Sequence, residues 1–160
     1  MRHIIGSVLT PLHGGRPFII AHVVNTSGVM GAGVAKALSD RWPQVREVYM
    51  RQPLGLGKVS WARVFSASIP GLVANMYAQT YGRHRFPLSL PHLEDCLREV
   101  ELTAQRDGLG VHIPRVGAGL ARGHWPDIAL LIPDSWTCYT LPDELAAFPV
   151  EAYENQVGMG

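Results

Sequence analysis

Short apolar runs and turn-forming residues alternate along the chain and predict most of its secondary structure. Residues 18–24 form a continuous apolar, β-branched run of the kind found in strands that are covered on both faces. Another apolar run, at residues 2–8, ends before Pro11 and the glycine pair at positions 14–15. We therefore predict strands at residues 2–8 and 18–24.

Helical spacing of apolar residues begins after the first of these segments. Residues 34–38 predict one helix, and after the interruption at Pro43 residues 44–51 predict a second, short one. The longest helix is predicted between Ser89, a capping residue, and Gly108. Its apolar side chains recur at i, i+3, i+4, i+7 and i+11, the spacing of one buried helix face: Leu93, Cys96, Leu97, Val100 and Ala104.

Two strands are predicted at residues 58–65 and 72–77. The turn between them is expected at residues 66–71, where Pro70 and Gly71 are strong turn signals, so we predict an antiparallel hairpin.

The last elements are strands at residues 111–116 and 136–141, with a short helix at residues 125–131 between them. Because helices are interspersed among the strands, we predict an α/β fold. Its three layers, α/β/α, would have a mixed, mostly parallel central sheet of about six strands.

Composition fits one globular domain. The chain has 160 residues, of which 47% are hydrophobic and 17% are charged. A disordered chain would be more charged and less apolar. We predict one domain over residues 1–141, followed by an acidic tail at residues 142–160 that is partly packed or frayed.

The net charge of +1 conceals an uneven distribution. Residues 1–122 hold 14 basic and 7 acidic residues (14 − 7 = +7), whereas residues 123–160 hold 6 acidic residues and no Lys or Arg (0 − 6 = −6). The near-neutral total excludes a protein that holds a nucleic-acid backbone by bulk electrostatics. The basic body remains compatible with a local anion site.

Cysteine usage and the N-terminus favour a cytoplasmic protein. Cys96 and Cys138 form neither a disulfide framework nor a CxxC pair. The N-terminus lacks the features of a signal peptide, and no run approaches the roughly 18 apolar residues of a membrane helix. The histidines show no HExxH and no zinc spacing with cysteine, so we expect no metal. We also expect a monomer that requires no cofactor and does not bind membranes.

Two glycine-rich segments, residues 25–33 and 117–123, each follow an apolar strand and precede a helix. Glycine lets the backbone approach a ligand closely, and a helix N-terminus adds unsatisfied N–H donors, so phosphate is the natural ligand. Two such loops at the carboxyl edge of one sheet would form a single crevice, which makes a diphosphate a good candidate. The alternative is that the glycines serve only tight turns.

The familiar nucleotide motifs do not fit these loops. A phosphate-cleaving P-loop requires a lysine after the last glycine of the first loop, where Val34 stands. A dinucleotide fingerprint requires GxGxxG, whereas the first loop has GxxGxG and the second has Arg122 at the third glycine position. A hydride-transferring oxidoreductase is therefore the weakest of the functions considered.

The two loops resemble those of macrodomains. The first run reads HVVNTSGVMGAGVA from His22, followed by RWP at residues 41–43; the second reads HIPRVGAGL from His112, with Trp125 five residues on. The resemblance is to the branch that includes terminal ADP-ribose glycohydrolases acting on glutamate esters and antitoxin macrodomains that remove ADP-ribose from DNA. It covers roughly residues 2–141, and the order of strands and helices also matches.

The resemblance implies an ADP-ribose site. The turn at residues 6–8 would border the adenine, Asn25 and the backbone of residues 30–34 would hold the distal ribose and its phosphate, and residues 116–121 would wrap the diphosphate. The segment at residues 77–86 mixes aromatic and basic residues, which suits either a stacked base or a solvated connection. The residues expected to bind the ligand are Ser7, Val8, Asn25, Met30, Gly31, Ala32, Gly33, Val34, Gln79, Tyr81, Val116, Gly117, Ala118, Gly119, Leu120 and Ala121.

The sequence departs from the family pattern at three places. Ser7 replaces the aspartate that usually accepts the adenine amino proton. The lysine and the aspartate of the glutamate-ester hydrolases are also replaced, by residues 78–80 (Ala-Gln-Thr) and by Ala121. The lysine-dependent mechanism is therefore not expected. Catalysis would instead use a water positioned by a ligand phosphate, with Asn25 orienting the distal ribose and His124 as an acid or base. The alternative for His124 is a surface histidine at a helix start.

Two functions follow from these residues. The first is a hydrolase that removes ADP-ribose from an ester-type linkage on an acidic protein side chain, a nucleic acid or a phosphate. The second is a module that binds or sequesters ADP-ribose or a related nucleotide without turnover. The expected partners are ADP-ribose and ADP-ribosylated protein or nucleic acid.

Overall fold

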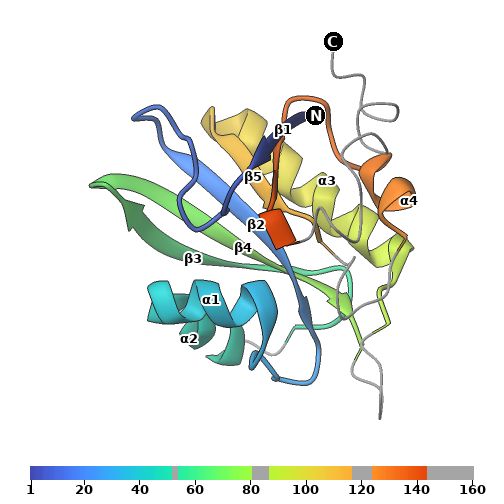
Figure 1. The fold of residues 1–160 in the computed structure, drawn as a ribbon. Helices are drawn as coiled ribbons and strands as arrows, with labels where there is room; N and C mark the ends of the chain where they lie inside the picture. Colours follow the sequence, from blue (N-terminus) through green and yellow to red (C-terminus); the bar gives the residue numbers. More distant parts are fainter. Residues whose placement is uncertain (52–53, 81–86, 117–123, 144–160) are drawn as a thin grey trace.

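The computed structural model describes residues 1–51, 54–80, 87–116 and 124–143 (Figure 1). Helices are interspersed among strands along the chain in the predicted order. The elements are β1 (Arg2–Ile5), β2 (Phe18–Asn25), α1 (Gly33–Arg41), α2 (Pro43–Arg51), β3 (Val59–Ser66), β4 (Ile69–Gln79), α3 (Leu90–Asp107), β5 (Gly110–Pro114), α4 (Trp125–Ala129) and β6 (Thr137–Thr140).

The strands form one mixed sheet in the order β1-β6-β5-β2-β4-β3. All neighbouring pairs are parallel except β3 and β4, which form the predicted antiparallel hairpin. The carboxyl ends of β1, β6, β5, β2 and β4 therefore lie at the same edge of the sheet. This edge is where open α/β sheets bind ligands.

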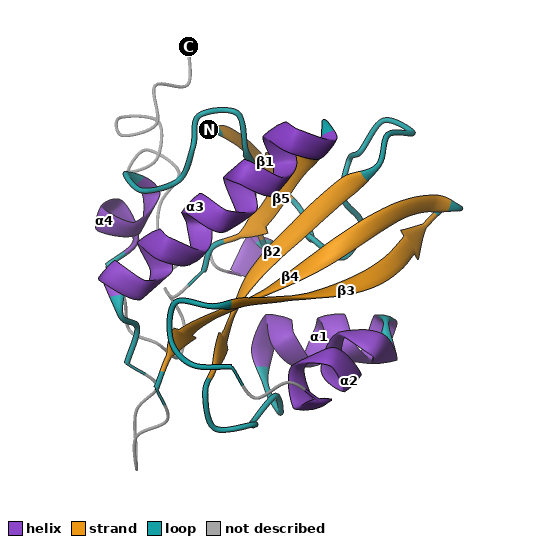
Figure 2. Cartoon of the chain, turned by 180° about the vertical axis from the view of Figure 1, so that it is seen from behind, coloured by secondary structure: helices purple, strands orange, loops and turns teal. Residues whose placement is uncertain are grey.

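Helices cover both faces of the sheet, as predicted. Figure 2 shows α3 and α4 on one face and α1 and α2 on the other. Each helix layer buries its own apolar cluster against the strands, with Leu93 and Ile128 on the first face and Leu38 and Val45 on the second. Along β2, Ile19 and Ala21 face α3 while Phe18 and Ile20 face α1 and α2. The strand is buried on both faces, which explains its continuous apolar run.

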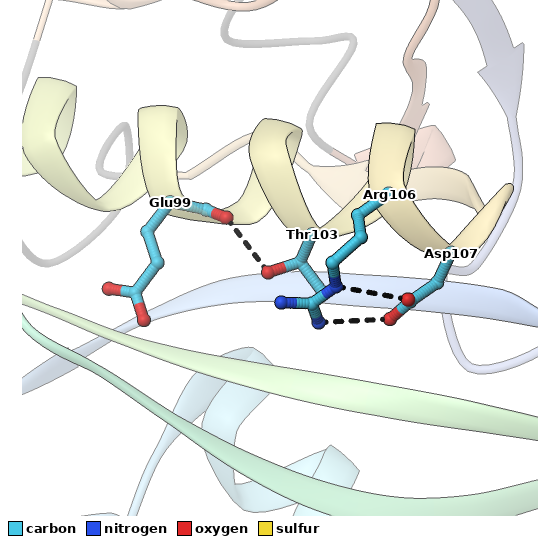
Figure 3. A network of polar contacts seen from close by, with 4 residues as sticks. All are labelled: Glu99, Thr103, Arg106 and Asp107. Atoms are coloured by element: carbon cyan, nitrogen blue, oxygen red, sulfur yellow. Dashed lines mark hydrogen bonds and ion pairs between the residues drawn. The ribbon is translucent and has the colours of Figure 1, made fainter.

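Helix α3 follows the predicted pattern closely. Its five periodic apolar residues are all buried, Ser89 is the N-cap residue, and Gly108 ends the helix in the left-handed conformation at φ 67°. Its solvent face carries local polar contacts (Figure 3). The Thr103 hydroxyl donates to the Glu99 carbonyl oxygen at 3.0 Å, and the Arg106 guanidinium donates two 3.1 Å bonds to the Asp107 carboxylate. Such exposed pairs contribute little stability, so the buried face accounts for the helix position.

The hairpin turn lies within the predicted turn segment, residues 66–71, but not at its Pro-Gly pair. The chain reverses three residues before that pair, at Ala67 and Ser68, whose φ values of 49° and 68° are positive as in the primed hairpin turns. Pro70 and Gly71 belong to β4. Pairing with β2 begins at Gly71, so Pro70 precedes it and its missing N–H leaves no gap in that ladder.

Side chains cover part of the sheet edge formed by β3. The indole Nε1 of Trp42 donates to the carbonyl oxygen of Phe65, and the amide of Gln44 donates to that of Arg63, both at 2.9 Å. These side chains occupy acceptors that an edge strand offers to other chains. Within the described residues, no helix is long and apolar enough to cross a membrane.

Candidate functional site

Strands β2 and β5 bring the beginnings of both glycine-rich segments to the same sheet edge. The two strands pair in parallel from Phe18 opposite Gly110 to Ile20 opposite His112. The first segment leaves β2 at Asn25. The second follows β5, and Val116 at its start is buried beneath α3 and α4. The remaining predicted residues of that loop, and Tyr81, lie outside the described residues: Gly117, Ala118, Gly119, Leu120 and Ala121.

The first loop is closed by the side chain of Asn25. Its Oδ1 accepts the backbone N–H groups of Ser27 at 3.0 Å and Val29 at 3.3 Å, and its Nδ2 donates to the Val29 carbonyl oxygen at 2.6 Å. Asn25 is 5% exposed. Within the described residues its Nδ2 makes this one bond, so its second N–H is the group that a ligand would meet.

Backbone geometry keeps the rest of the loop open. Gly28 and Gly33 adopt positive φ values of 78° and 61°, a conformation that side chains disfavour. A Cβ added to Gly31 or Gly33 would meet no described heavy atom within 4 Å. Met30 points inward and is buried in the cluster beneath α1 and α2. The loop thus presents glycine backbone to solvent while one side chain anchors it.

Helix α1 begins directly at this loop and is suited to an anion. Its N-cap residue Ala32 has no side chain that can accept a hydrogen bond, and its first turn holds no acidic residue. The N–H groups of the first turn lack intrahelical partners, and the helix dipole adds partial positive charge there. An anion bound at this end would accept hydrogen bonds from these N–H groups and would be attracted by the partial positive charge.

Tyr49 of α2, a residue for which the sequence patterns predict no role, lies beneath the first loop. Its hydroxyl is 2.7 Å from the main-chain carbonyl oxygen of Asn25 and 2.8 Å from Oδ1 of the same residue. Its ring stacks on Tyr77 with centroids 5.6 Å apart. Burial raises the pKa of Tyr49 to about 12, so its hydroxyl stays protonated and can donate.

A row of polar side chains crosses the sheet beneath α2. His22, Asn75 and Ser60 stand opposite one another on β2, β4 and β3. The Asn75 Oδ1 bonds His22 Nε2 at 2.5 Å, and the Asn75 Nδ2 donates to the Ser60 hydroxyl at 3.2 Å and to the Val45 carbonyl oxygen at 3.3 Å. Burial lowers the pKa of His22 to about 4, although the Asn75 bond opposes that shift. His22 is therefore a neutral structural residue at neutral pH.

His112 is also structural. It bonds the Tyr139 hydroxyl at 2.7 Å from a buried position on β5. Burial, with smaller effects of the charges on His13 and Arg2, lowers its pKa to about 4. His22 and His112 are thus both buried, hydrogen-bonded histidines.

The end of β4 lies beside the first loop. Gln79 stands opposite Asn25 after a register shift at Val24, and its carbonyl oxygen accepts the N–H of Thr26 at 3.0 Å. The structure thus places Gln79 beside the first loop, and its role in ligand binding stays a prediction. Ala78 and Gln79 are the last residues of β4 and lie at this same sheet edge.

The turn after β1 reaches the same edge. Gly6 donates its N–H to the Thr140 carbonyl oxygen at 2.9 Å. The Ser7 hydroxyl accepts the N–H of Leu9 at 3.1 Å, so one of its acceptor positions stabilises its own turn. Val8 is buried in the same apolar cluster as Met30. The first turn and the first loop are therefore both anchored in the same apolar cluster.

The contacts of His124 differ from those of the buried residues at this sheet edge. It is the N-cap residue of α4, and its side chain is 70% exposed with Nδ1 3.3 Å from the Asp127 carboxylate. These features are those of a surface histidine at a helix start, and its catalytic role stays a prediction. No cluster of three metal-ligating side chains is found in the part of the chain that the structure describes.

Comparisons with known sequences identify distant relatives of the chain. No family model matches the chain. It is 26% identical to an uncharacterised 17.5 kDa protein of Enterobacteria phage T4, over 86% of this chain and 90% of that protein. It is 24% identical to the mouse chromodomain-helicase-DNA-binding protein 1-like, over 93% of this chain. The match spans only 18% of the length of that mouse protein.

Solved structures give closer matches in fold. A macrodomain protein from Streptomyces coelicolor has a TM-score of 0.71 and 29% identity, over 88% of this chain and 97% of that one. A Bacteroides thetaiotaomicron protein has a TM-score of 0.76 and 27% identity, over 88% and 96%. The DarTG protein of Thermosipho africanus, solved in complex with ADP-ribose, has a TM-score of 0.66 and 19% identity, over 87% of this chain and 42% of that one.

Proposed function

The chain has the macrodomain fold, and from that premise we propose that it binds ADP-ribose and hydrolyses an ester-type bond at the distal ribose. The observation that carries the binding proposal is the geometry of the first loop and α1. An open glycine backbone leads into a helix N-terminus that has no acidic residue in its first turn. Such a site favours a dianionic diphosphate. ADP-ribose is the ligand of a neighbour in fold, the Thermosipho africanus protein.

The proposed ligand orientation follows the resemblance of the loops. The adenine lies against Ser7 and Val8, and the diphosphate lies between the first loop and the loop that follows β5. The distal ribose lies near Asn25, within reach of its second side-chain N–H. Gln79, opposite Asn25 on β4, borders the same end of the ligand.

The proposed reaction breaks the bond between the anomeric carbon of the distal ribose and an acceptor oxygen. A water oxygen adds to that carbon, and a proton from the water passes to the leaving oxygen. A ligand phosphate holds the water, and the protein supplies orientation through Asn25 and the loop backbone. His124 is the proposed proton donor or acceptor from the second-loop side. A carboxylate, a sugar hydroxyl or a phosphate is a suitable leaving group.

A binding module without turnover is the second candidate. Three observations favour it: residues 78–80 include no lysine, Ala121 replaces the aspartate, and His22 and His112 are buried and neutral. Asn25, moreover, uses most of its bonding capacity on its own loop. Such a protein would still recognise ADP-ribose through the same two loops.

Two measurements separate these proposals. Titration calorimetry with ADP-ribose, and with ADP and NAD for comparison, tests binding. Incubation with ADP-ribosylated protein, ADP-ribosylated DNA and ADP-ribose 1″-phosphate, followed by detection of free ADP-ribose, tests hydrolysis. Release from one substrate supports the hydrolase, whereas binding without release from any of the three supports the module. No binding of ADP-ribose at millimolar concentration contradicts both.

A further inference from the structure

The Tyr49 hydroxyl contacts both the main-chain carbonyl oxygen and the side-chain oxygen of Asn25. Its hydroxyl proton is shared between the main-chain carbonyl oxygen at 2.7 Å and Oδ1 at 2.8 Å. The same Oδ1 accepts the N–H groups of Ser27 and Val29. One phenol from α2 thus fixes the last backbone group of β2 and the side chain that closes the first loop.

Tyr49 is itself held rigidly from below. Tyr77 stacks on its ring at an interplanar angle of 27°, and the Tyr77 hydroxyl lies 3.2 Å from the Tyr49 carbonyl oxygen and 3.3 Å from the Ser60 hydroxyl. The hydrogen-bond network extends further, because Ser60 is bonded to Asn75 and Asn75 is bonded to His22. Tyr49 is 2% exposed, so water does not replace its hydroxyl readily. Buried, connected polar groups of this kind define one conformation.

We propose that Tyr49 is a positioning residue for the ligand loop. Its hydroxyl selects the Asn25 conformation that closes residues 25–29 and thereby directs the glycine backbone that follows toward the ligand. The inference deepens the proposed function and rests on it. Tyr49 is proposed to act through Asn25 and the loop, not on the reacting atoms, so it is not a catalytic residue.

Loss of the hydroxyl has a defined consequence. In Tyr49→Phe the carbonyl oxygen and Oδ1 of Asn25 lose a buried donor, and the loop samples conformations that do not bind. The apparent affinity falls with the fraction of molecules in the competent conformation. We expect ADP-ribose to bind about tenfold more weakly.

Tyr139→Phe is the matched control. Tyr139 is also buried, and its hydroxyl accepts the Leu12 N–H at 2.9 Å and bonds His112 at 2.7 Å, but it belongs to β6, which β5 separates from β2. We expect a similar loss of stability in urea unfolding and unchanged ADP-ribose affinity. Equal affinity of Tyr49→Phe and the wild-type protein overturns the proposal, and so does an equal loss of affinity in the control.

A spectroscopic readout separates positioning from ligand binding. The side-chain amide resonances of Asn25 in a ¹⁵N-correlated spectrum of the free protein should shift in Tyr49→Phe and stay unchanged in Tyr139→Phe. If the wild-type protein does not bind ADP-ribose, the proposed function fails while this readout still tests the contact. If Tyr49→Phe does not fold, Tyr77→Phe replaces it and should shift the same resonances by less. Unshifted Asn25 resonances overturn the proposal.

Discussion

The ring of Phe18 occupies the space in which a side chain on Gly71 would lie. The two residues stand opposite each other on β2 and β4, and an ideal Cβ on Gly71 would overlap three carbons of the Phe18 ring. Phe18 is fully buried. Glycine at this position is therefore required by packing between neighbouring strands, not by a turn.

We predict that Gly71→Ala destabilises the fold by about 1–3 kcal/mol, because the added methyl displaces a buried aromatic ring. Urea unfolding measures this cost. Gly110→Ala is the control, since Gly110 pairs with Phe18 from the other side and its Cβ would meet only the His112 Nε2, at 3.9 Å. A loss in Gly71→Ala no larger than that in Gly110→Ala would contradict the packing argument.

Acid should destabilise the protein through His22. Burial holds its folded-state pKa at about 4, below the unfolded value of about 6.5. The unfolded chain therefore binds the proton first, and stability is full above about pH 6.5 and falls as the pH drops toward about 4. Between about pH 7.5 and about pH 5, His22 should account for about 2 kcal/mol of the loss.

His22→Gln should reduce the pH dependence of urea unfolding by this amount. Parallel stability curves for His22→Gln and the wild-type protein would show that His22 is not responsible.

Local sequence patterns predicted those parts of the fold whose structure depends only on residues within one segment. The apolar spacing and the flanking Ser89 and Gly108 predicted α3, and the two glycine segments predicted the sheet edge of the site. The predicted turn segment, residues 66–71, contains the observed turn, but Pro70 and Gly71 belong to β4, because their role depends on β2, a strand distant in sequence. Neither Ala67 nor Ser68 is a typical residue for positive φ, so the true turn had no local signal.

The role of Tyr49 in the candidate site likewise could not be predicted from local sequence patterns. Its position in α2 predicts only a buried helical residue, and its contact with Asn25 depends on how α2 packs against β2. Asn25 was selected from its loop motif as a ribose contact. Its bonds to Ser27, Val29 and Tyr49 add a loop-closing role that only tertiary structure reveals.

Gly33 should be essential for binding but not for folding. Its positive φ of 61° makes a side chain cost about 1 kcal/mol, and the space around it is open among the described residues. Gly33→Glu places a carboxylate where a phosphate is proposed to bind, so we predict that calorimetry detects no ADP-ribose binding. Gly108→Glu is matched, with φ 67° and open space at the far end of α3, and should retain affinity. Normal binding by folded Gly33→Glu would refute the site.

Ala32 offers a test in which stability and binding change in opposite directions. It is the N-cap residue of α1, with extended backbone angles (φ −150°, ψ 163°) that suit a capping side chain, yet its methyl group cannot accept a hydrogen bond. Ala32→Asp and Ala32→Ser should each stabilise the fold by about 1 kcal/mol. Urea unfolding measures this gain.

The two variants should differ in binding because only aspartate adds negative charge. A carboxylate at the N-cap takes up backbone N–H groups of α1 and repels the diphosphate, so Ala32→Asp should bind ADP-ribose at least about tenfold more weakly than Ala32→Ser. The neutral serine separates this charge effect from loss of the N–H donors themselves. If calorimetry gives the same affinity for both stabilised variants, the helix N-terminus does not hold the phosphate, and the ligand is bound elsewhere on the sheet edge.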